Sequence, residues 1–296
     1  MKMTYIPRIQ GNMKGYKTIY TTRATSRIID GSYNSIYKGR SMNFDELREY
    51  VTGDDIKDVD WKASSRSQKL LVRQYIAEKK HNVMLVMDAG RKMLANANET
   101  QEKREIALMA AGTLAYMVGS NGDFVSATYA AEDGVKHFPF KTGLMNVERI
   151  LAAYHSDVTV DCRSGISQSL EFITRNFRRR MIMLIVTDAE GILEIDESLI
   201  RQLKVVHDIL LVKVSDADTT GKGVYDMGED MYIPDFFSKD KKLARIEAQR
   251  RVQLERQCSD KLKKLGVSYV CVSQLENMEE SIVELLGRHK NESSSR

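Results

Sequence analysis

The chain has 296 residues, with 45 lysines and arginines against 41 aspartates and glutamates, and a formal net charge of +4. This small excess does not by itself indicate a nucleic-acid-binding protein. Three widely spaced cysteines without a CxxC pair signal neither a disulfide framework nor a zinc site, which fits a reduced, cytoplasmic setting. The longest apolar run, residues 106–118, is too short to cross a bilayer, so we expect no direct membrane insertion.

Residues 1–80 predict a smaller, β-rich N-terminal region. Its first half is rich in polar turn residues and is typical of short β segments and loops. The stretch NFDELREYV, residues 43–51, predicts one short helix, because Asn43 suits the cap and Glu46 the capping-box position. The stretch KLLVRQYI, residues 69–76, predicts a strand that leads into the rest of the chain.

Residues 81–290 predict a second domain in which strands alternate with helices. Such alternation favours an α/β fold with a parallel-dominated sheet and helices on both faces, and residues 291–296 form a polar tail. The predicted strands are 83–88, 123–131, 135–140, 181–188, 208–214 and 267–272. The predicted helices are 100–119, 143–154, 165–177, 197–205, 238–265 and 277–288.

Two buried strands of this domain each end on an aspartate. Asp88 follows VMLVM, and Asp188 follows IMLIVT. If these strands are parallel neighbours, both carboxylates emerge at the carboxyl edge of the sheet, where open α/β sheets bind ligands. Two converging carboxylates suit a hard cation such as Mg²⁺, with hydroxyls from Thr187, Ser167 or Ser169 to complete the site. The other interpretation is that each aspartate caps the helix after its strand.

The stretch from Gly53 to Arg73 concentrates acidic and basic side chains around the only tryptophan, Trp61. One interpretation is structural: a Gly-Asp turn held by an Arg–Asp network, with Trp61 as the apolar anchor. A second is a recognition surface, and a third is an active site of paired carboxylates. No histidine, cysteine or serine is placed as a nucleophile with its base, and the sequence contains no phosphate-binding GxxxxGK[ST] loop.

The segment from residue 31 to residue 93 resembles the family called domain of unknown function 58. That family pairs a Phe-acid-x-Leu-Arg-Glu-Tyr stretch with GDD and then DWK, as residues 44–50, 53–55 and 60–62 do here. The resemblance covers roughly residues 6–285. The residues that carry the family motifs are Phe44, Arg48, Gly53, Asp54, Asp55, Asp60, Trp61 and Arg66.

The same resemblance implies a von Willebrand factor A-like domain with a metal-ion-dependent adhesion site. That site uses an Asp-x-Ser-x-Ser loop, a distant threonine and a later aspartate; Asp88, Ser167 and Asp188 take the Asp and hydroxyl positions here. Gly90 and Lys92 replace the two serines, so the site is degenerate. If Lys92 folds inward, its ammonium can occupy the metal's place; if it points to water, the site is only weakened. We therefore expect no cofactor, or at most weakly bound Mg²⁺.

The resemblance implies a bacterial, non-enzymatic binding or scaffold protein that works with a MoxR-type AAA+ ATPase in the assembly or activation of other proteins. The client protein is unknown, and no nucleic-acid partner is expected. The alternative is a metal-assisted hydrolase that uses Asp88, Asp188 and the Asp54–Asp60 cluster. The cluster distinguishes the two: its carboxylates either lie beside Asp88 in an open pocket or are consumed by arginine and backbone partners.

Overall fold

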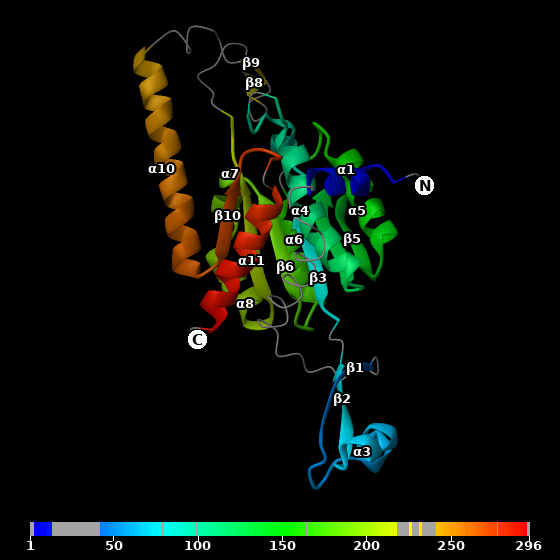
Figure 1. Cartoon of the computed structure of the whole chain (residues 1–296). Helices are drawn as coiled ribbons and strands as arrows, with labels where there is room; N and C mark the ends of the chain where they lie inside the picture. The colour runs from blue at the N-terminus through cyan, green and yellow to red at the C-terminus, as the bar shows by residue number, and fades with distance from the viewer. Residues whose placement is uncertain are drawn as a thin grey trace. The chain divides into compact units, whose positions relative to one another are not determined.

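The computed structural model describes residues 3–13, 42–77, 80–98, 100–163, 165–217, 225–226, 231–232, 241–276 and 278–294. The chain divides into two compact units (Figure 1). The larger contains residues 1–32 and 81–296, and the smaller contains residues 33–80. None of the described helices is both long enough and apolar enough to cross a membrane.

The larger unit is built on a six-stranded sheet in the order β10-β7-β6-β3-β4-β5. All neighbouring strands are parallel except β5, which runs antiparallel to β4 at one edge. The chain fills the sheet from β3 towards β5, then returns to β6 and fills the other half, so the direction of winding reverses between β3 and β6. The strands are β3 (Asn82–Met87), β4 (Phe124–Ala131), β5 (Gly134–Lys141), β6 (Ile182–Thr187), β7 (Asp208–Val214) and β10 (Ser268–Val272).

Helices cover both faces of this sheet. On one face, α4 packs against α1, α5 and α11, and on the other α6 packs against α8 while α10 packs against α7 and α8. The predicted fold class, a von Willebrand factor A-like α/β domain with a parallel-dominated sheet, is confirmed. The helices are α1 (Tyr5–Asn12), α4 (Lys103–Ser120), α5 (Leu144–Asp157), α6 (Ile166–Asn176), α7 (Ala189–Glu194), α8 (Glu197–Val206), α10 (Lys241–Leu265) and α11 (Met278–Ser294).

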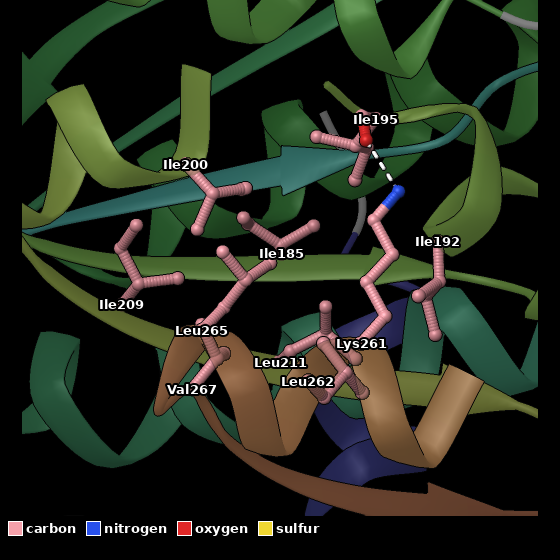
Figure 2. Close-up of a pocket in the computed structure, with 10 residues that line it drawn as sticks. All are labelled: Ile185, Ile192, Ile195, Ile200, Ile209, Leu211, Lys261, Leu262, Leu265 and Val267. Carbon is pink, nitrogen blue, oxygen red and sulfur yellow. Dashed lines mark hydrogen bonds between the residues drawn. The ribbon is translucent and has the colours of Figure 1, made fainter. Parts of the chain in front are cut away.

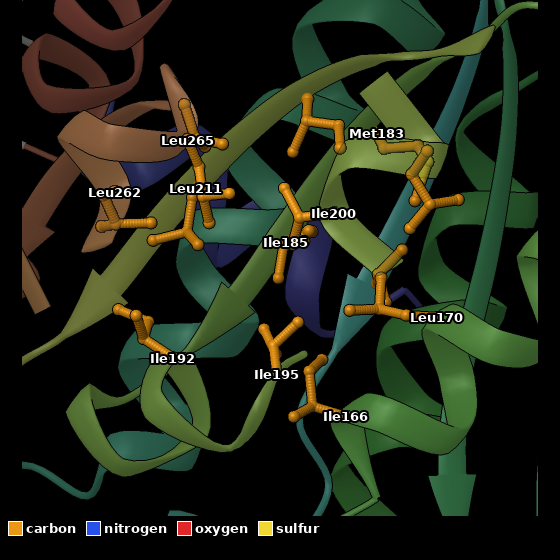
Figure 3. Packing of buried hydrophobic residues seen from close by; sticks show 14 of the residues in the cluster. Ile166, Leu170, Met183, Ile185, Ile192, Ile195, Ile200, Leu211, Leu262 and Leu265 are labelled. Carbon is orange, nitrogen blue, oxygen red and sulfur yellow. The ribbon is translucent and has the colours of Figure 1, made fainter. Parts of the chain in front are cut away.

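The core between the sheet and the α6–α8–α10 face is aliphatic. Figure 3 shows side chains of β6 and β7 packed against leucines of α10 and isoleucines around α7 and α8. One gap remains there, a cavity of about 10 Å³ with a largely aliphatic lining (Figure 2). It is no larger than one water molecule, and water needs polar partners, so it is not a ligand site. Beside it the ammonium of Lys261 bonds to the carbonyls of Leu193 and Ile195, at the end of α7.

The prediction that residues 1–80 form one β-rich region is wrong at its start. Residues 5–12 form the helix α1, and they belong to the larger unit. The helix buries Ile6 and Ile9, and it packs on α4 and α5. Its start is held from outside: the carboxylate of Glu148, on α5, accepts the backbone N–H groups of Thr4, Tyr5 and Ile6 at 2.5–3.1 Å. These are the donors that a helix leaves without an intrahelical partner. A buried acid from a distant helix therefore caps α1, which no local pattern could predict.

Glu148→Gln should loosen α1 without unfolding the sheet. The amide retains one acceptor oxygen but loses the charge. We therefore expect the free energy that holds α1 in place to fall by about 1.5–3 kcal/mol, the range for hydrogen bonds to charged groups. Hydrogen exchange of the α1 amides should become faster while β3 and β6 stay protected. Glu284→Gln, at an exposed ion pair on α11, is the matched control and should leave α1 unchanged. Equal protection of α1 in both variants would show that Glu148 does not hold the helix.

The smaller unit is an antiparallel pair, β1 (Met42–Glu49) and β2 (Leu71–Ala77), joined through η1 (Ile56–Asp58) and α3 (Trp61–Ser67). The predicted helix at 43–51 is therefore wrong. Seven residues of β1 pair with β2, with a bulge between Phe44 and Glu46, and this long-range pairing outweighs a local capping pattern. The predicted strand at 69–76 corresponds to β2.

Four further segments either differ from the predictions in part or lie outside the described residues. The short segments predicted in residues 16–39, and the predicted helix start at Ser238, fall outside the described residues. Helix α11 continues through Ser294 into the predicted polar tail. A short pair, β8 (Tyr225–Asp226) and β9 (Met231–Tyr232), follows β7 in the chain.

Candidate functional site

Asp88 and Asp188 lie side by side where the winding of the sheet reverses. Asp88 follows β3 and Asp188 follows β6, and these strands are parallel neighbours with Met87 opposite Val186. The backbone N–H of Asp88 donates to the Val186 carbonyl at 2.9 Å, which extends the pairing to the strand ends. Both aspartates are fully buried. The predicted convergence of the two carboxylates at the carboxyl edge is confirmed.

Lys92 fills the space between the two carboxylates. It lies in η2 (Arg91–Leu94), and its ammonium is 3.0 Å from Asp188 Oδ1 and 3.3 Å from Asp88 Oδ2. The carboxylate of Glu194 lies 3.9 Å away. Burial by itself lowers the pKa of Lys92, but attraction to Asp88, Asp188 and Glu194 outweighs it and raises this pKa. Of the two orientations that the sequence leaves open, the lysine adopts the inward one and stays charged.

A second lysine, Lys103, reaches the same aspartate from the other side. It is the first residue of α4, is buried, and places its ammonium 2.9 Å from Asp188 Oδ2 and in contact with Asp216. Burial lowers its pKa, but Asp188 and Asp216 more than compensate, so the pKa is raised. Sequence reasoning missed this residue. The available signal was a lysine at the head of a helix that is apolar on every side.

Asp188 remains ionised between the two ammonium groups. Burial by itself raises the pKa of Asp188. The attraction of Lys103 and Lys92 and the Gly191 N–H hydrogen bond outweigh burial and lower this pKa to about 2. A carboxyl whose pKa is lower in the folded state contributes stability above its unfolded pKa and loses it as the pH falls through the folded value. The Asp188 contribution is therefore complete at neutral pH and is lost only as the pH falls from the ordinary aspartate pKa towards about 2.

The two carboxylates also accept hydrogen bonds from a hydroxyl and from backbone N–H groups. The Thr187 hydroxyl donates to Asp88 Oδ2 at 2.7 Å and the Gly90 N–H to Asp88 Oδ1 at 3.1 Å. The Gly191 N–H donates to Asp188 Oδ1 at 2.9 Å, and Asp188 is the N-cap of α7. For Asp188, then, the two interpretations of the sequence are compatible, because the same side chain caps a helix and forms part of the edge cluster.

The serines predicted to supply a hydroxyl bind elsewhere. Ser167 Oγ lies 3.5 Å from the Glu194 carbonyl, and Ser169 Oγ donates to the Gly165 carbonyl at 3.2 Å. The hydroxyl that contacts Asp88 comes from Thr187, the residue directly before the second aspartate. A strand position beside the sheet's own edge places this hydroxyl better than the first turn of α6 does.

These contacts do not fit a divalent metal ion. A hard cation needs several free oxygen ligands around one point. Here the point between the carboxylates holds an ammonium, and the four buried charges of Asp88, Asp188, Lys92 and Lys103 sum to zero. Within the described residues, no group of three or more histidine, cysteine, aspartate or glutamate side chains could hold a metal ion. The cluster is a closed ion-pair network in which lysine takes the place of a metal.

Gly191 is packed directly against the network. A Cβ at this position would overlap the Thr187 hydroxyl and lie 2.9 Å from Asp88 Oδ2 and 3.0 Å from Lys92 Nζ. The sequence signal was the turn AEG after the second aspartate, but only the packing shows that a side chain has no room there.

Gly191→Ala should destabilise the larger unit by about 1–3 kcal/mol, the usual cost of overpacking. The matched control is Gly287→Ala in α11, where a Cβ meets nothing within 4 Å. That change should be neutral or stabilise by about 0.5–1 kcal/mol, because alanine is the better helix former. Urea unfolding of both variants checks the difference. If both glycine variants were equally stable, the network would tolerate expansion.

The aspartates of the GDD and DWK motifs are all bound within the smaller unit. Asp54 accepts from Arg48 at 2.6 and 2.7 Å and from the Val51 N–H. Asp55 caps η1 through the Lys57 N–H. Asp60 caps α3 through two backbone N–H groups and also accepts from Arg73 at 3.0 Å. The predicted Arg–Asp network is present. The carboxylates of Asp54, Asp55 and Asp60 are used by arginine and backbone partners, which is the outcome that favours a binding protein over a hydrolase.

The other motif residues have different surroundings. The prediction that Trp61 is an apolar anchor is wrong, because its side chain is 63% exposed, whereas Val59 and Val72 are the buried apolar residues of the described part of this unit. Gly53 has a φ of +112°, which explains a glycine in this turn. Phe44 lies in β1 opposite Tyr75. Arg66 is exposed in the last turn of α3.

Comparison with known families decides the affiliation. The family described as protein of unknown function DUF58 matches residues 46–227, which include the GDD and DWK motifs and the edge cluster. This chain belongs to the DUF58 family. The match contains Asp88, Lys92, Lys103 and Asp188, so the lysine-filled network lies within the region that defines the DUF58 match.

Mycobacterial proteins described as uncharacterized are similar in sequence to this chain. Uncharacterized proteins of Mycobacterium tuberculosis and Mycobacterium bovis are each 25% identical to this DUF58 protein over 191 residues, 64% of this chain and 60% of theirs. The match thus spans less than two thirds of the length of these relatives.

Solved structures offer only a distant likeness. A conserved hypothetical protein, BatB from Bacteroides thetaiotaomicron, has a TM-score of 0.47 at 15% identity, covering 71% of this chain and 99% of that one. A von Willebrand factor type A protein from Catenulispora acidiphila has a TM-score of 0.39 at 12% identity, covering 75% of this chain and 45% of that one. The fold assignment therefore rests on the strand order of the DUF58 protein itself.

Proposed function

We propose that this DUF58 protein is a non-enzymatic binding or scaffold protein whose von Willebrand factor A-like domain binds its partner without a divalent metal ion. The observation that carries the proposal is the position of Lys92, whose ammonium neutralises the two edge carboxylates from within. A site of this kind offers no coordination position to a ligand. Recognition must then use the shape and the charges of the loops around the network.

The contacts of the acidic residues also favour binding over hydrolysis. A metal-assisted hydrolase would need Asp88, Asp188 or the Asp54–Asp60 cluster to hold a metal ion and activate water. Asp188 instead is ion-paired with two lysines, and Asp54 and Asp60 are bound to arginines and backbone donors. These carboxylates are acceptors already in use, so none is a ready general base.

The partner we propose is a MoxR-type AAA+ ATPase, as the family resemblance implies, in the assembly or activation of other proteins. The proposed contact is the carboxyl edge of the sheet and the loop of residues 89–99. Arg91 is exposed in η2 after β3, Glu190 is exposed in α7 after β6, and the two carry opposite charges. Such rim charges set the register and the association rate of a complex.

The test is a binding titration with a purified MoxR-type ATPase of the same organism. Arg91→Glu and Glu190→Arg should each weaken binding by roughly tenfold, a typical cost for charge reversal at an interface. Arg178→Glu is the matched control, because it reverses an exposed arginine just before β6, at the other end of the parallel strands. Unchanged affinity in both edge variants would place the interface elsewhere. Loss of nucleotide-free binding on addition of EDTA would contradict metal independence.

A further inference from the structure

Three large apolar side chains of the smaller unit face solvent within eleven residues. Val51, Ile56 and Trp61 are 62%, 66% and 63% exposed. Exposing a tryptophan forgoes the large favourable burial of its ring, and this is the only tryptophan in the chain. Scattered exposed apolar residues are ordinary, but three within eleven residues, with an aromatic among them, mark this segment as a candidate binding surface.

The backbone beneath these side chains is fixed by aspartates. The Val51 N–H donates to Asp54, which is itself clamped by Arg48 through two hydrogen bonds. Ile56 is the first residue of η1, and Trp61 is the first residue of α3; each element begins at a capping aspartate. The exposed side chains therefore start from a preorganised backbone. Preorganisation reduces the entropy cost of binding, which is the reason rigid aromatic anchors dominate protein interfaces.

Unpaired positive charge surrounds this apolar segment. Lys57, Lys62 and Arg66 are exposed, and none of the ion pairs of the described residues includes them. The nearby acids differ, because Asp54 and Asp60 are neutralised by arginines that the fold itself supplies. What the segment offers to a partner is a tryptophan and two aliphatic side chains. Beside them lie these three cations and two acids, Asp55 and Asp58, that no arginine of the described residues neutralises.

We propose that residues 51–66 form a docking surface for a partner protein, with Trp61 entering an apolar pocket that has acidic residues at its rim. The charges favour a protein over a phosphate polymer or an anionic lipid surface. Asp55 and Asp58 lie in the same segment and would repel a uniformly anionic ligand, whereas a protein can place its acids only opposite Lys57, Lys62 and Arg66. The inference is independent of the lysine-filled network at the sheet edge.

Selection from a random peptide library against the full chain tests this surface. Enriched peptides should contain a large apolar residue flanked by aspartate or glutamate. Their affinity should fall roughly 30-fold in Trp61→Ala, as for a hot-spot residue, and roughly tenfold in a Lys62→Glu/Arg66→Glu double variant. Val205→Ala is the matched control, since Val205 is 86% exposed on α8 in the larger unit, and it should bind as the wild type does.

Three results would overturn the proposal. Enriched peptides that lack acidic residues would show that the surface has no preference for acidic partners. Peptides that bind Trp61→Ala as well as the wild type would show that this segment is not the docking surface. Trp61-dependent binding of single-stranded DNA or phosphatidylserine vesicles, without peptide binding, would assign the segment to nucleic acid or membrane. Because Trp61 is the only tryptophan, its fluorescence reports its environment directly. Emission typical of a buried indole in the free protein would show that the chain itself covers this surface.

Discussion

Lys92→Met is expected to lower the free energy of unfolding by about 3–5 kcal/mol, the usual cost of removing one partner from a buried ion pair. Methionine fills much the same volume, so the loss is electrostatic. Asp88 and Asp188 then face each other with Lys103 as their only nearby ammonium. Because both aspartates are fully buried, water cannot take the place of the lost cation.

The pH dependence separates this explanation from simple loss of packing. A buried carboxyl that loses a neighbouring cation and faces a second carboxylate has a raised pKa in the folded state. A raised folded-state pKa means that the protonated form is favoured in the fold, so the stability deficit of the variant should shrink as the pH falls from about 8 to about 5. Wild-type stability should change little over that range on account of Asp188, whose pKa is about 2.

Lys69→Met is the matched control, because Lys69 and its partner Glu49 are both about two-thirds exposed. Exposed pairs contribute little, so this variant should unfold close to the wild type at every pH. A deficit in Lys92→Met that stays constant with pH would indicate a packing defect. A deficit no larger than that of the Lys69 variant would show that the buried carboxylates do not depend on Lys92.

The sequence predicts the larger unit well, because its elements carry strong local signals. Strands β3 and β6 are continuous apolar runs, as expected for strands buried on both faces, and each ends on an aspartate. Residue periodicity also placed the helices that cover the sheet. The convergence of Asp88 and Asp188 followed from a single assumption, that β3 and β6 are neighbours, and the sheet has that order.

The errors fall where long-range contacts override local pattern. Asn43 and Glu46 form a good capping pattern, yet the segment pairs with β2 across more than twenty residues of chain. Trp61 has the large apolar ring expected of a core residue, but it is the first residue of α3 and its side chain is exposed. Ser167 has the required chemistry but bonds to the Glu194 carbonyl, and Thr187 supplies the hydroxyl. Lys103 gave a local signal at the head of an apolar helix, but its role could not be deduced from it, because its partner Asp188 lies 85 residues away.

Replacing both Gly90 and Lys92 with serine should create a divalent-metal site, whereas the wild type should bind Mn²⁺ weakly or not at all. The change removes the internal ammonium and restores two hydroxyls to the loop after β3. Gly90 has a φ of −63°, so serine fits its backbone without strain. The apo form of this variant should be less stable than the wild type, for the reason given for Lys92→Met, and Mn²⁺ should restore stability by about 2.7 kcal/mol at a concentration 100 times its Kd.

Three further proteins define what makes the site. Lys92→Met removes the ammonium without adding hydroxyls, so it should gain less Mn²⁺ affinity than the serine variant. Asp88→Ala in the serine background should abolish binding, because it removes a charged ligand. Lys103→Gln in that background should strengthen binding, since Lys103 still neutralises Asp188 at 2.9 Å.

Calorimetric titration with Mn²⁺ measures all of these proteins. Tight binding by the wild type would mean that Lys92 leaves the network readily, and no gain in any serine variant would mean that the loop cannot direct two hydroxyls at one ion.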